Sequence, residues 1–228
     1  QEEIVEEIES YQKIIDGARM VVENYKPRIV IDPEWEMVEL GNVCEIISGY
    51  GFDSKDFSNE NGAKCIKITN VGVRDFITDT NENLPEEFLS RYSKFTVCNG
   101  DLVLSLTRSI ISSGLKVAKV PNEWNKSLVN QRVAGIKAKE GTDINFIYLF
   151  LCTDTVYKFV EEKSRSLMQP NLSILDLKKL KLPFPSFNIQ QEIVVKIETE
   201  QSVVDSNKHL IYIFEQKIKD RIAKVWGE

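Results

Sequence analysis

Two stretches of this chain, 189 residues apart, have almost the same sequence. The first is QEEIVEEIES from position 1, and the second is QQEIVVKIET from position 190. A repeated segment indicates one structural part that is used twice, so it constrains what the residues between the copies can be. Residues 1–19 and 190–208 share eight identities: Gln1/Gln190, Glu3/Glu192, Ile4/Ile193, Val5/Val194, Ile8/Ile197, Glu9/Glu198, Gln12/Gln201 and Asp16/Asp205.

Both copies begin long amphipathic helices. Apolar residues recur at alternating steps of four and three, which is a heptad pattern that needs a helical partner. Pro27 ends the first helix, because the residue before a proline avoids the helical conformation. The partner is either the other helix or a second copy of the chain. The apolar heptad positions of the first helix are occupied by Ile4, Ile8, Tyr11, Ile15, Ala18, Val22 and Tyr25. Those of the second helix are occupied by Ile193, Ile197, Val204, Ile211, Phe214, Ile218 and Val225.

The segment between the helices has the texture of an α+β domain with mostly antiparallel strands. Short runs rich in β-branched residues lie between Gly, Asn, Asp and Ser. We predict a single helix over 142–163, capped by Thr142 or Asp143, and a short helix that ends near Lys179. The predicted domains are 1–32, 33–187 and 188–228. The predicted strands lie in WEMVEL, VCEII, KCIKIT, FTVC, DLVLSLT, LKVAKV and RVAGIKA, and "KLKLPFP" is a final extended stretch.

The charge of the chain is unevenly distributed. The formal net charge is −6. Residues 91–139, however, contain nine bases against only Asp101 and Glu123, a net charge of +7. A local basic patch matters more for contact with phosphates than the total charge does. The distribution therefore favours a nucleic-acid contact within the middle domain.

Four loop-like stretches in or beside this basic segment carry side chains suited to DNA. Arg, Asn and Gln can contact base edges in the major groove, while Lys and Ser suit phosphates. The candidate DNA-binding residues are Lys67, Thr69, Asn70, Arg74, Ser105, Thr107, Arg108, Ser109, Lys126, Asn130, Gln131, Arg132, Lys163, Arg165 and Gln169.

The sequence contains few signs of catalytic or metal-binding chemistry. No C-x-x-C pair exists among the four cysteines, and His209 is the one histidine, so no zinc-ligand spacing can be built. SGYGFD lacks the third glycine of a nucleotide-binding loop. No apolar run approaches the roughly 20 residues of a membrane span. We therefore predict no catalytic residue, no metal and no cofactor, and we expect the chain in the cytoplasm, away from membranes.

Several stretches resemble the specificity subunits of type I restriction-modification systems. They are EWEMVELGNVCEIISGYGF, CNGDLVLSLT, SLVNQRVAGIKA and SLMQPNLSILDLKKLKLPFPSFNIQQEIVVKIE, and the resemblance extends over essentially all of the chain. The most specific part is residues 167–198, where Gln169 and Asn171 precede a proline-rich strand and the repeat at Gln190.

This resemblance implies a fold and a function. It implies one target recognition domain between two conserved helices that pack as an antiparallel coiled coil. It implies recognition of one half of a bipartite double-stranded DNA target, docking of methylation (M) subunits and a restriction (R) subunit, and a role in host defence without catalysis. Members of the family typically have two recognition domains, so this chain is expected to correspond to the C-terminal half.

Two alternatives stay open at this point. A Mg²⁺-dependent DNA nuclease or modification enzyme would use an acid beside a lysine, which Glu161 and Lys163 nominally provide. A helix-mediated oligomerisation module would use the heptad seams to pair two copies of the chain, as a homodimer.

Overall fold

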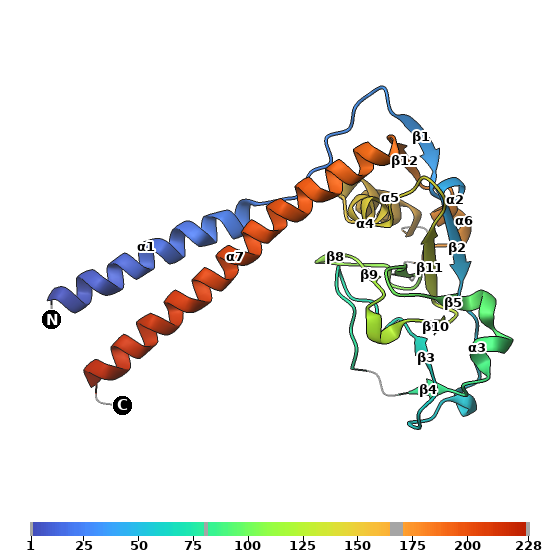
Figure 1. Ribbon diagram of the computed structural model, residues 1–228, viewed down its shortest axis with the longest axis horizontal. Helices are drawn as coiled ribbons and strands as arrows, with labels where there is room; N and C mark the ends of the chain where they lie inside the picture. The colour runs from blue at the N-terminus through green and yellow to red at the C-terminus, as the bar shows by residue number, and fades with distance from the viewer. Residues whose placement is uncertain (1, 80–81, 165–170, 227–228) are drawn as a thin grey trace. The chain divides into compact units, whose positions relative to one another are not determined.

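The computed structural model describes residues 2–79, 82–164 and 171–226. The chain forms two compact units (Figure 1). One consists of Gln1–Arg28 and Ile193–Glu228, and the other of Ile29–Glu192. The expected domain boundaries, at 32 and 187, differ from this division by a few residues and stay a prediction.

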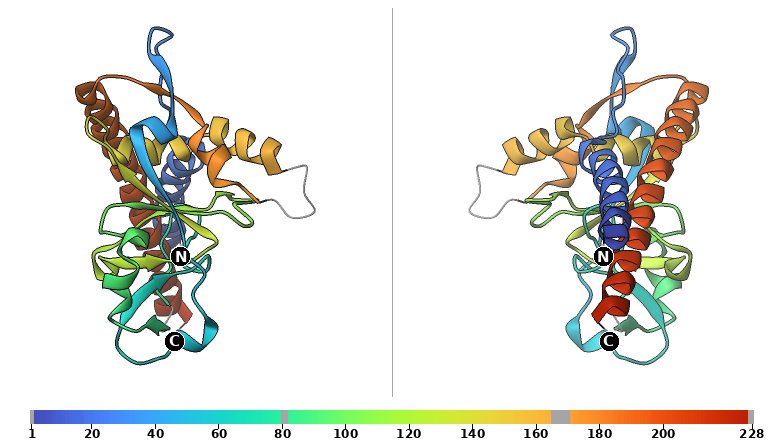
Figure 2. Two further views of the ribbon diagram at one scale, coloured as in Figure 1. Left: turned by 90° about the vertical axis from the view of Figure 1, so that its right-hand side faces the viewer. Right: turned by 90° about the vertical axis from the view of Figure 1, so that its left-hand side faces the viewer.

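The first unit is a pair of long helices, α1 (Glu2–Asn24) and α7 (Phe187–Trp226), of which α7 begins in the other unit. The helices lie side by side and run in opposite directions (Figure 2). Arg19 near the end of α1 forms an ion pair of 2.7 Å with Glu215. The ring centroids of Tyr11 and Phe214 lie 5.3 Å apart. The expected antiparallel pairing of the two helices is therefore confirmed.

The repeat in the sequence is also a repeat in the structure. Ile15 and Val204, which occupy matching positions, are both buried. In α1 the amide of Gln12 donates to Asp16 at 2.8 Å, and in α7 the amide of Gln201 donates to Asp205 at 3.1 Å. Both bonds are exposed, and each joins two side chains that lie one helical turn apart. The identities that a heptad seam does not require thus make the same local contact twice.

In its described residues, the second unit contains two four-stranded sheets and two two-stranded pairs. The smaller pairs are β1 (Glu36–Glu39) with β12 (Lys181–Phe184), and β7 (Ile110–Ile111) with β8 (Gly114–Leu115). The order in one sheet is β2 (Cys44–Ser48), β11 (Val133–Ala138), β6 (Leu102–Ser105) and β9 (Val117–Lys119); the order in the other is β4 (Asn83–Leu84), β3 (Ala63–Ile66), β10 (Ser127–Val129) and β5 (Thr96–Val97).

Each of the seven predicted strand runs contains a strand. The pairing is antiparallel except between β10 and β3, which are parallel. The α+β class with mostly antiparallel sheets is therefore confirmed. Asn99 and Gly100 form a tight turn, in which the N–H of Asp101 donates to the carbonyl of Cys98 at 3.1 Å and Gly100 has a φ of +87°.

The two four-stranded sheets share one apolar core. Its buried side chains come from strands of both sheets, including Ile47 of β2, Val103 of β6, Ile66 of β3 and Val129 of β10. A second cluster, with Leu128 and several aromatic rings, packs on the other face of the β3–β10 sheet. Because each strand is short, burial on both faces lets even three-residue strands contribute to stability.

The predicted single helix over 142–163 is wrong. The structure has two helices, α4 (Ile144–Leu151) and α5 (Asp154–Ser164). The hydroxyl of Thr153 donates to the carbonyl of Phe150 at 2.7 Å, and the guanidinium of Arg74 donates to the carbonyl of Cys152 at 2.9 Å. These bonds satisfy carbonyls that a continuous helix would use, so the first helix ends there. Asp143 does cap α4, as one of the two expected candidates.

The remaining helices are short. They are α2 (Leu40–Val43), α3 (Phe88–Arg91) and α6 (Ile174–Lys178), with single 3₁₀ turns at Ser54–Asp56, Ser93–Phe95 and Asn122–Trp124. The hydroxyl of Ser173 accepts the N–H of Asp176 at 3.0 Å and caps α6. No helix in the described ranges is long and apolar enough to cross a membrane.

The first residue of the second repeat, Gln190, has a structural role. Its side chain is fully buried in the second unit. The amide nitrogen donates to the carbonyls of Pro185, at 2.9 Å, and Gly141, at 3.3 Å. The amide oxygen accepts the N–H of Asp143, at 2.8 Å, just before α4. Gln190 therefore fixes the beginning of α7 to the cap of α4.

We predict that Gln190→Leu lowers the free energy of unfolding by about 2–4 kcal/mol, because it leaves a buried N–H and two carbonyls without partners. Gln191→Leu is the matched control, since Gln191 is exposed. It should change stability by less than about 0.5 kcal/mol. Denaturant unfolding of the two variants measures the difference, and equal midpoints would contradict the role of Gln190.

Candidate nucleic-acid interface

The topology of the larger antiparallel sheet brings several loops to one edge. In the register, Ser48 pairs with Ala134, Ser105 pairs with Val133, and Leu104 pairs with Val117. The ends of β2 and β6 therefore lie beside the beginnings of β11 and β9. Connecting segments leave the sheet at this end of the strands, which we call the loop edge. They are the loops at 49–51, 106–109 and 130–132, and residue 116, which precedes β9.

The second sheet adds the loop that follows β3. Strands β3 and β10 are parallel, and Ile66 pairs with Val129 where both strands end. The N–H of Asn130 donates to the carbonyl of Ile66 at 3.0 Å. The loop from 67 to 74 and the loop from 130 to 132 therefore leave the two strands side by side, at the loop edge.

Backbone hydrogen bonds join these loops to one another. The N–H of Leu106 donates to the carbonyl of Arg132, and the N–H of Leu172 donates to the carbonyl of Leu106, both at 2.9 Å. Thr107 and Asn171 form an isolated antiparallel bridge. Four stretches that lie far apart in the sequence thus meet at the loop edge, namely 67–74, 106–109, 130–132 and 171–172.

Gly49 allows one of these approaches. A Cβ atom at this position would lie 1.9 Å from the carbonyl oxygen of Asn130, which no side chain can occupy. The neighbouring N–H of Tyr50 donates to the carbonyl of Val129 at 2.9 Å. The chain after β2 therefore packs directly against the backbone of the 130–132 loop.

Eight of the predicted DNA-binding residues lie on the loops at this edge and retain solvent exposure. Thr69, Arg74 and Arg108 are exposed, as are Gln131 and Arg132; the half-buried ones are Lys67, Thr107 and Asn130. Lys67 forms an ion pair with Glu82, and its ammonium lies 3.8 Å from the ring centroid of Phe57. Its charge is therefore already partly neutralised.

Three predicted contact residues are buried, and we remove them from the contact set. Asn70 accepts the N–H of Lys67 at 2.9 Å and donates to the carbonyl of Ile77 at 2.8 Å. The hydroxyl of Ser105 donates to the carbonyl of Thr107 at 2.7 Å. Ser109 is also fully buried. Side chains placed in this way support the loops and do not face a ligand.

The remaining candidates lie elsewhere or are not described. Lys126 precedes β10, whereas the loop edge follows that strand, so Lys126 lies at the opposite end together with the turn at Cys98. Lys163, on α5, has its ammonium 3.9 Å from a carboxylate oxygen of Asp176. Arg165 and Gln169 lie outside the described residues.

Three predicted basic residues have left-handed backbone conformations. The φ angles are +60° at Arg74, +49° at Arg108 and +60° at Lys126. This conformation costs a residue with a Cβ roughly 1–2 kcal/mol. Two of the three lie at the loop edge, so the fold holds these cations in place at some cost in stability. Such strain is often found at functional sites.

Sequence analysis missed Lys116, which lies among these loops. Its ammonium donates to the carbonyl of Ile68 at 3.1 Å. Burial lowers the pKa of Lys116, and the positive charge of Arg108 lowers the pKa further. In the sequence this lysine lies inside the strand-like run LKVAKV and carries no loop signal. Lys116 reaches the loop edge only through the pairing of the hairpin, which places it opposite Ser109, the neighbour of Arg108.

The structure offers little support for metal chemistry. Among the described residues, no group of three His, Cys, Asp or Glu side chains could hold a metal ion. Glu161 and Lys163, the nominal acid and lysine of a nuclease, both lie on α5, with Lys163 directed to Asp176.

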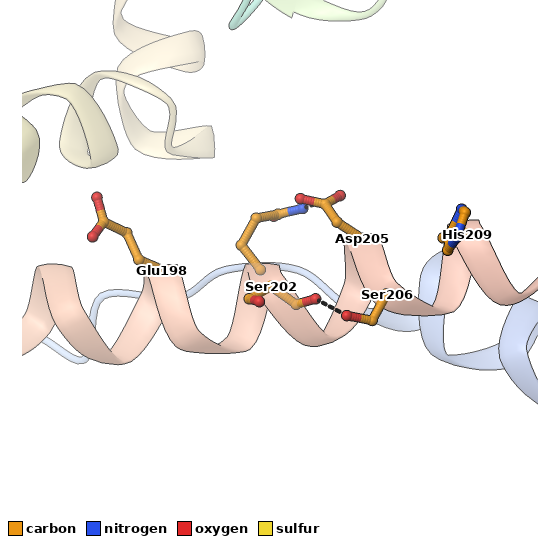
Figure 3. Close-up of a pocket in the computed structure, with 6 residues that line it drawn as sticks. Glu198, Ser202, Asp205, Ser206 and His209 are labelled. Carbon is orange, nitrogen blue, oxygen red and sulfur yellow. Dashed lines mark hydrogen bonds between the residues drawn. The ribbon is translucent and has the colours of Figure 1, made fainter.

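A shallow polar hollow lies along α7 (Figure 3). Its lining comprises Glu198, Gln201, Ser202, Asp205, Ser206 and His209. The hydroxyl of Ser206 donates to the carbonyl of Ser202 at 2.8 Å. Hydrogen bonds from Lys208 and Gln201 lower the pKa of Asp205. The Ser206 hydroxyl is thus bonded to the helix backbone. A serine hydrolase would instead need this hydroxyl to be bonded to a histidine.

A family model of the type I restriction modification DNA specificity domain matches residues 33–212 of the chain. The specificity subunit of the type I restriction enzyme MjaVIII from Methanocaldococcus jannaschii is 29% identical over 195 residues, which are 85% of this chain and 44% of that protein. The EcoAI specificity subunit from Escherichia coli is 26% identical over 182 residues, 78% of this chain and 30% of that one.

Solved structures of the same kind share the fold. The HsdS subunit from Thermoanaerobacter tengcongensis has a TM-score of 0.57 at 18% identity, covering 96% of this chain and 52% of that one. A chain from a type I R-M system has a TM-score of 0.64 at 17% identity, covering 96% and 53%. The chain therefore spans about half of the length of these structures, and less than half of the two specificity subunits above.

We predict that Asn70→Ala destabilises the loop at 67–77 by about 1–3 kcal/mol, because the Lys67 N–H loses its acceptor and the Ile77 carbonyl loses its donor. Thr69→Ala, at the exposed neighbouring position, is the control and should leave stability nearly unchanged. Amide hydrogen exchange across 67–77 measures the local effect. The same protection in both variants would contradict the supporting role of Asn70.

Proposed function

The chain belongs to the family of type I restriction modification DNA specificity domains, and we propose that it is the sequence-specific DNA-recognition part of a type I restriction-modification complex. It contacts one half of a bipartite double-stranded target. It has no catalytic activity of its own, and it works in the cytoplasm, where methylation and restriction subunits of the same system join it.

The observation that carries this proposal is the convergence of four loops at the loop edge. Arg108, Gln131 and Arg132 are exposed there on loops joined by backbone hydrogen bonds. A guanidinium can bond two acceptors of guanine, and an amide can bond adenine in the same way. Fixed loops with such side chains are suited to a series of neighbouring base pairs.

Tyr50 adds an aromatic group to this surface. It lies beside Asn130 and is 38% exposed, although its ring packs on Tyr92 and Phe95. The neighbouring rings, which include Phe52, restrict the orientation of Tyr50, and an amphipathic ring that stays partly exposed suits contact with a nucleotide. We include Tyr50 in the contact surface as a residue that position alone, not sequence, identifies.

The helices supply the second part of the proposed function. We propose that α1 and α7 set the distance to the other half of the target and bind methylation subunits. In support, exposed apolar side chains occur at matching positions, Ile14 with Val203 within the repeat and Val21 with Leu210 at the same offset just beyond it. Two equivalent apolar surfaces suit two copies of one partner. A homodimer through the same surfaces is the alternative, and light scattering of the purified chain distinguishes them.

We predict that Arg108→Ala and Arg132→Ala each relax the preference for one or two positions of the target. A good bidentate contact contributes about 1–3 kcal/mol of discrimination against a wrong base, or roughly 5- to 150-fold. Selection of bound DNA from a random pool, by the chain assembled with its methylation subunits, measures this. Lys137→Ala, at the opposite end of the same sheet, should select the same sequences as the unchanged chain. Unaltered preference in both arginine variants would refute the assignment of these loops.

We also predict that the isolated chain does not cleave or modify duplex DNA in the presence of Mg²⁺. The nominal nuclease pair is one acid and one lysine on α5, and Lys163 lies beside Asp176. The assay compares the unchanged chain with Glu161→Ala. Cleavage by the first and not by the second would replace the proposed function with the nuclease alternative.

A further inference from the structure

The repeat makes the contacts between the two long helices comparable with one another. Each residue of α1 has an equivalent residue 189 positions later in α7, and the two helices run in opposite directions (Figure 2). Exchange of α1 with α7 by a half-turn therefore turns each contact into a second, equivalent contact. Where two equivalent contacts differ in chemistry, the copies of the repeat are not interchangeable as partners.

One pair of equivalent contacts differs in this way. The ring centroids of Tyr11 and Phe214 lie 5.3 Å apart. The residue equivalent to Tyr11 is Glu200, and the residue equivalent to Phe214 is Tyr25. The equivalent contact is present, because the hydroxyl of Tyr25 donates to a carboxylate oxygen of Glu200 at 3.0 Å. An aromatic pair in one layer of the helix pair is thus matched, in the other layer, by a hydrogen bond to a carboxylate.

The bond between Tyr25 and Glu200 lies in the seam, the strip of heptad positions where the two helices meet. Tyr25 occupies a heptad position of the first helix, and Glu200 occupies the one equivalent to Tyr11; both are half-buried. Burial, and then the hydrogen bond to Glu200 and its negative charge, raise the pKa of Tyr25 to about 12. The N–H of Tyr25 donates to the carbonyl of Val21 at 3.1 Å, so its backbone continues the turn of α1.

A charged contact beside the seam also distinguishes the two copies. The guanidinium of Arg221 lies 2.8 Å from a carboxylate oxygen of Glu7. The hydroxyl of Tyr11 donates to the other carboxylate oxygen of Glu7 at 2.7 Å, which fixes its position. The residue equivalent to Glu7 in α7 is Lys196. A glutamate at this position attracts Arg221, whereas a lysine there would repel it.

A second copy of α7 in the place of α1 would lose both contacts. Glu200 of each helix would lie against the ring of Phe214 of the other, with no hydroxyl to donate to it. Lys196 of each helix would lie against Arg221 of the other. A carboxylate in a seam is unfavourable unless a donor bonds to it, and like charges at the edge of a coiled coil act against a partner.

The ion pair between Arg19 and Glu215 does not distinguish the copies. Its nitrogen and oxygen atoms lie 2.7 Å apart, and both side chains are exposed. The residue equivalent to Arg19 is Lys208, another cation, so a second copy of α7 would also attract Glu215. An exposed pair of this kind contributes little to stability. The choice of partner therefore depends on the two contacts above.

We propose that Glu200 and Arg221 select the partner of α7, since they fit a helix with the side chains of α1 and reject a second copy of α7. Tyr25 supplies the hydroxyl, and Glu7 the carboxylate, that this partner must carry. The inference goes beyond the proposed function, because it concerns pairing within the helical unit and is independent of any contact with DNA. A chain that contains one helix sequence twice needs such a distinction, because α7 would otherwise pair equally well with the α7 of another chain.

The first test gives α1 the seam residues of α7 within the full chain. Tyr11→Glu together with Tyr25→Phe reproduces, in one chain, the contacts of two α7 copies. Amide hydrogen exchange over residues 8–22 measures the opening of α1. Exchange should become faster by roughly tenfold or more, because Glu200 loses its donor and a second carboxylate lies against Phe214. Tyr212→Glu is the matched control, since Tyr212 is 60% exposed on α7, and it should leave exchange in α1 unchanged.

The reciprocal change separates partner selection from a general loss of helix stability. Glu200→Tyr and Phe214→Tyr, added to the two substitutions in α1, exchange the two layers and restore one ring pair and one hydroxyl–carboxylate pair. Exchange over residues 8–22 should return to within about threefold of that in the unchanged chain, because contacting residues are coupled. If the chain with four substitutions opens as fast as the chain with two, the proposal is overturned.

The second test detects a pair of α7 helices directly. Asn207 lies midway between Glu200 and Phe214 in the sequence and is half-buried. In a symmetric antiparallel pair of α7 helices, position 207 of one copy would therefore lie against position 207 of the other. Asn207→Cys in the full chain would allow a disulfide between two copies only when they pair in this way, because the two Cα atoms must lie within about 7 Å.

This measurement needs α7 to be free of its own partner. Ile15→Asp places a carboxylate at a buried seam position of α1, and Cys98→Ser removes an exposed thiol. With Glu200 and Arg221 unchanged, mild oxidation should give no dimer linked through position 207. Glu200→Tyr with Arg221→Glu should produce that dimer, because the first restores a ring pair and the second attracts Lys196. The same chains with Asn207 retained are the background control. A dimer without these two changes, or none with them, would overturn the proposal.

Discussion

The passage of the chain from β10 to β11 is the constraint on which the rest of the second unit depends. Asn130–Arg132 connects a strand of one sheet to a strand of the other, with only three residues available. Backbone bonds from this short segment reach Ile66 and Leu106. The sheets must therefore lie where these bonds can form, and the loops that end at this connection have little freedom to be anywhere else.

The helical unit is held together in a different way, by contacts between the side chains of its two helices. The two helices have related sequences, and Gln12 and Gln201 make the same bond at equivalent positions. Gln190, the first residue of the second copy, lies in the other unit, where its buried amide bonds to three backbone groups beside the beginnings of α4 and α7. The repeat therefore contains both a surface pattern and an anchor.

Most of the fold could be predicted from the sequence because its signals are local. β-branched runs indicated the strands, and the heptad pattern indicated the two long helices. The break at Cys152 could not be predicted, because a long-range bond from Arg74 helps to end α4 there. Periodicity within 142–163 is continuous, and nothing in that segment announces a partner from a distant loop.

The candidate site stays a prediction, and the structure adds only which of its residues are buried. Asn70, Ser105 and Ser109 have the same composition signal as exposed loop residues, yet each lies in the interior. Lys126 occurs in the same polar stretch as Gln131, but the short strand β10 separates them and directs them to opposite ends. Lys116 lies in a strand-like run and joins the cations only through the register of the hairpin. Each of these facts depends on pairing between segments that are distant in the sequence.

The bonds that hold the loops together have a consequence for how such a protein can change. Leu106, Arg132, Leu172 and Asn130 are joined through main-chain N–H and carbonyl groups. These groups are the same whatever side chain is present. Under the proposed function, replacement of the exposed side chains one at a time would produce new target preferences on an unchanged scaffold. Gly49 is an exception, because the backbone of Asn130 leaves no room for a Cβ there. Diversification of this surface is thus limited to a few outward positions, which makes new specificities accessible by small steps.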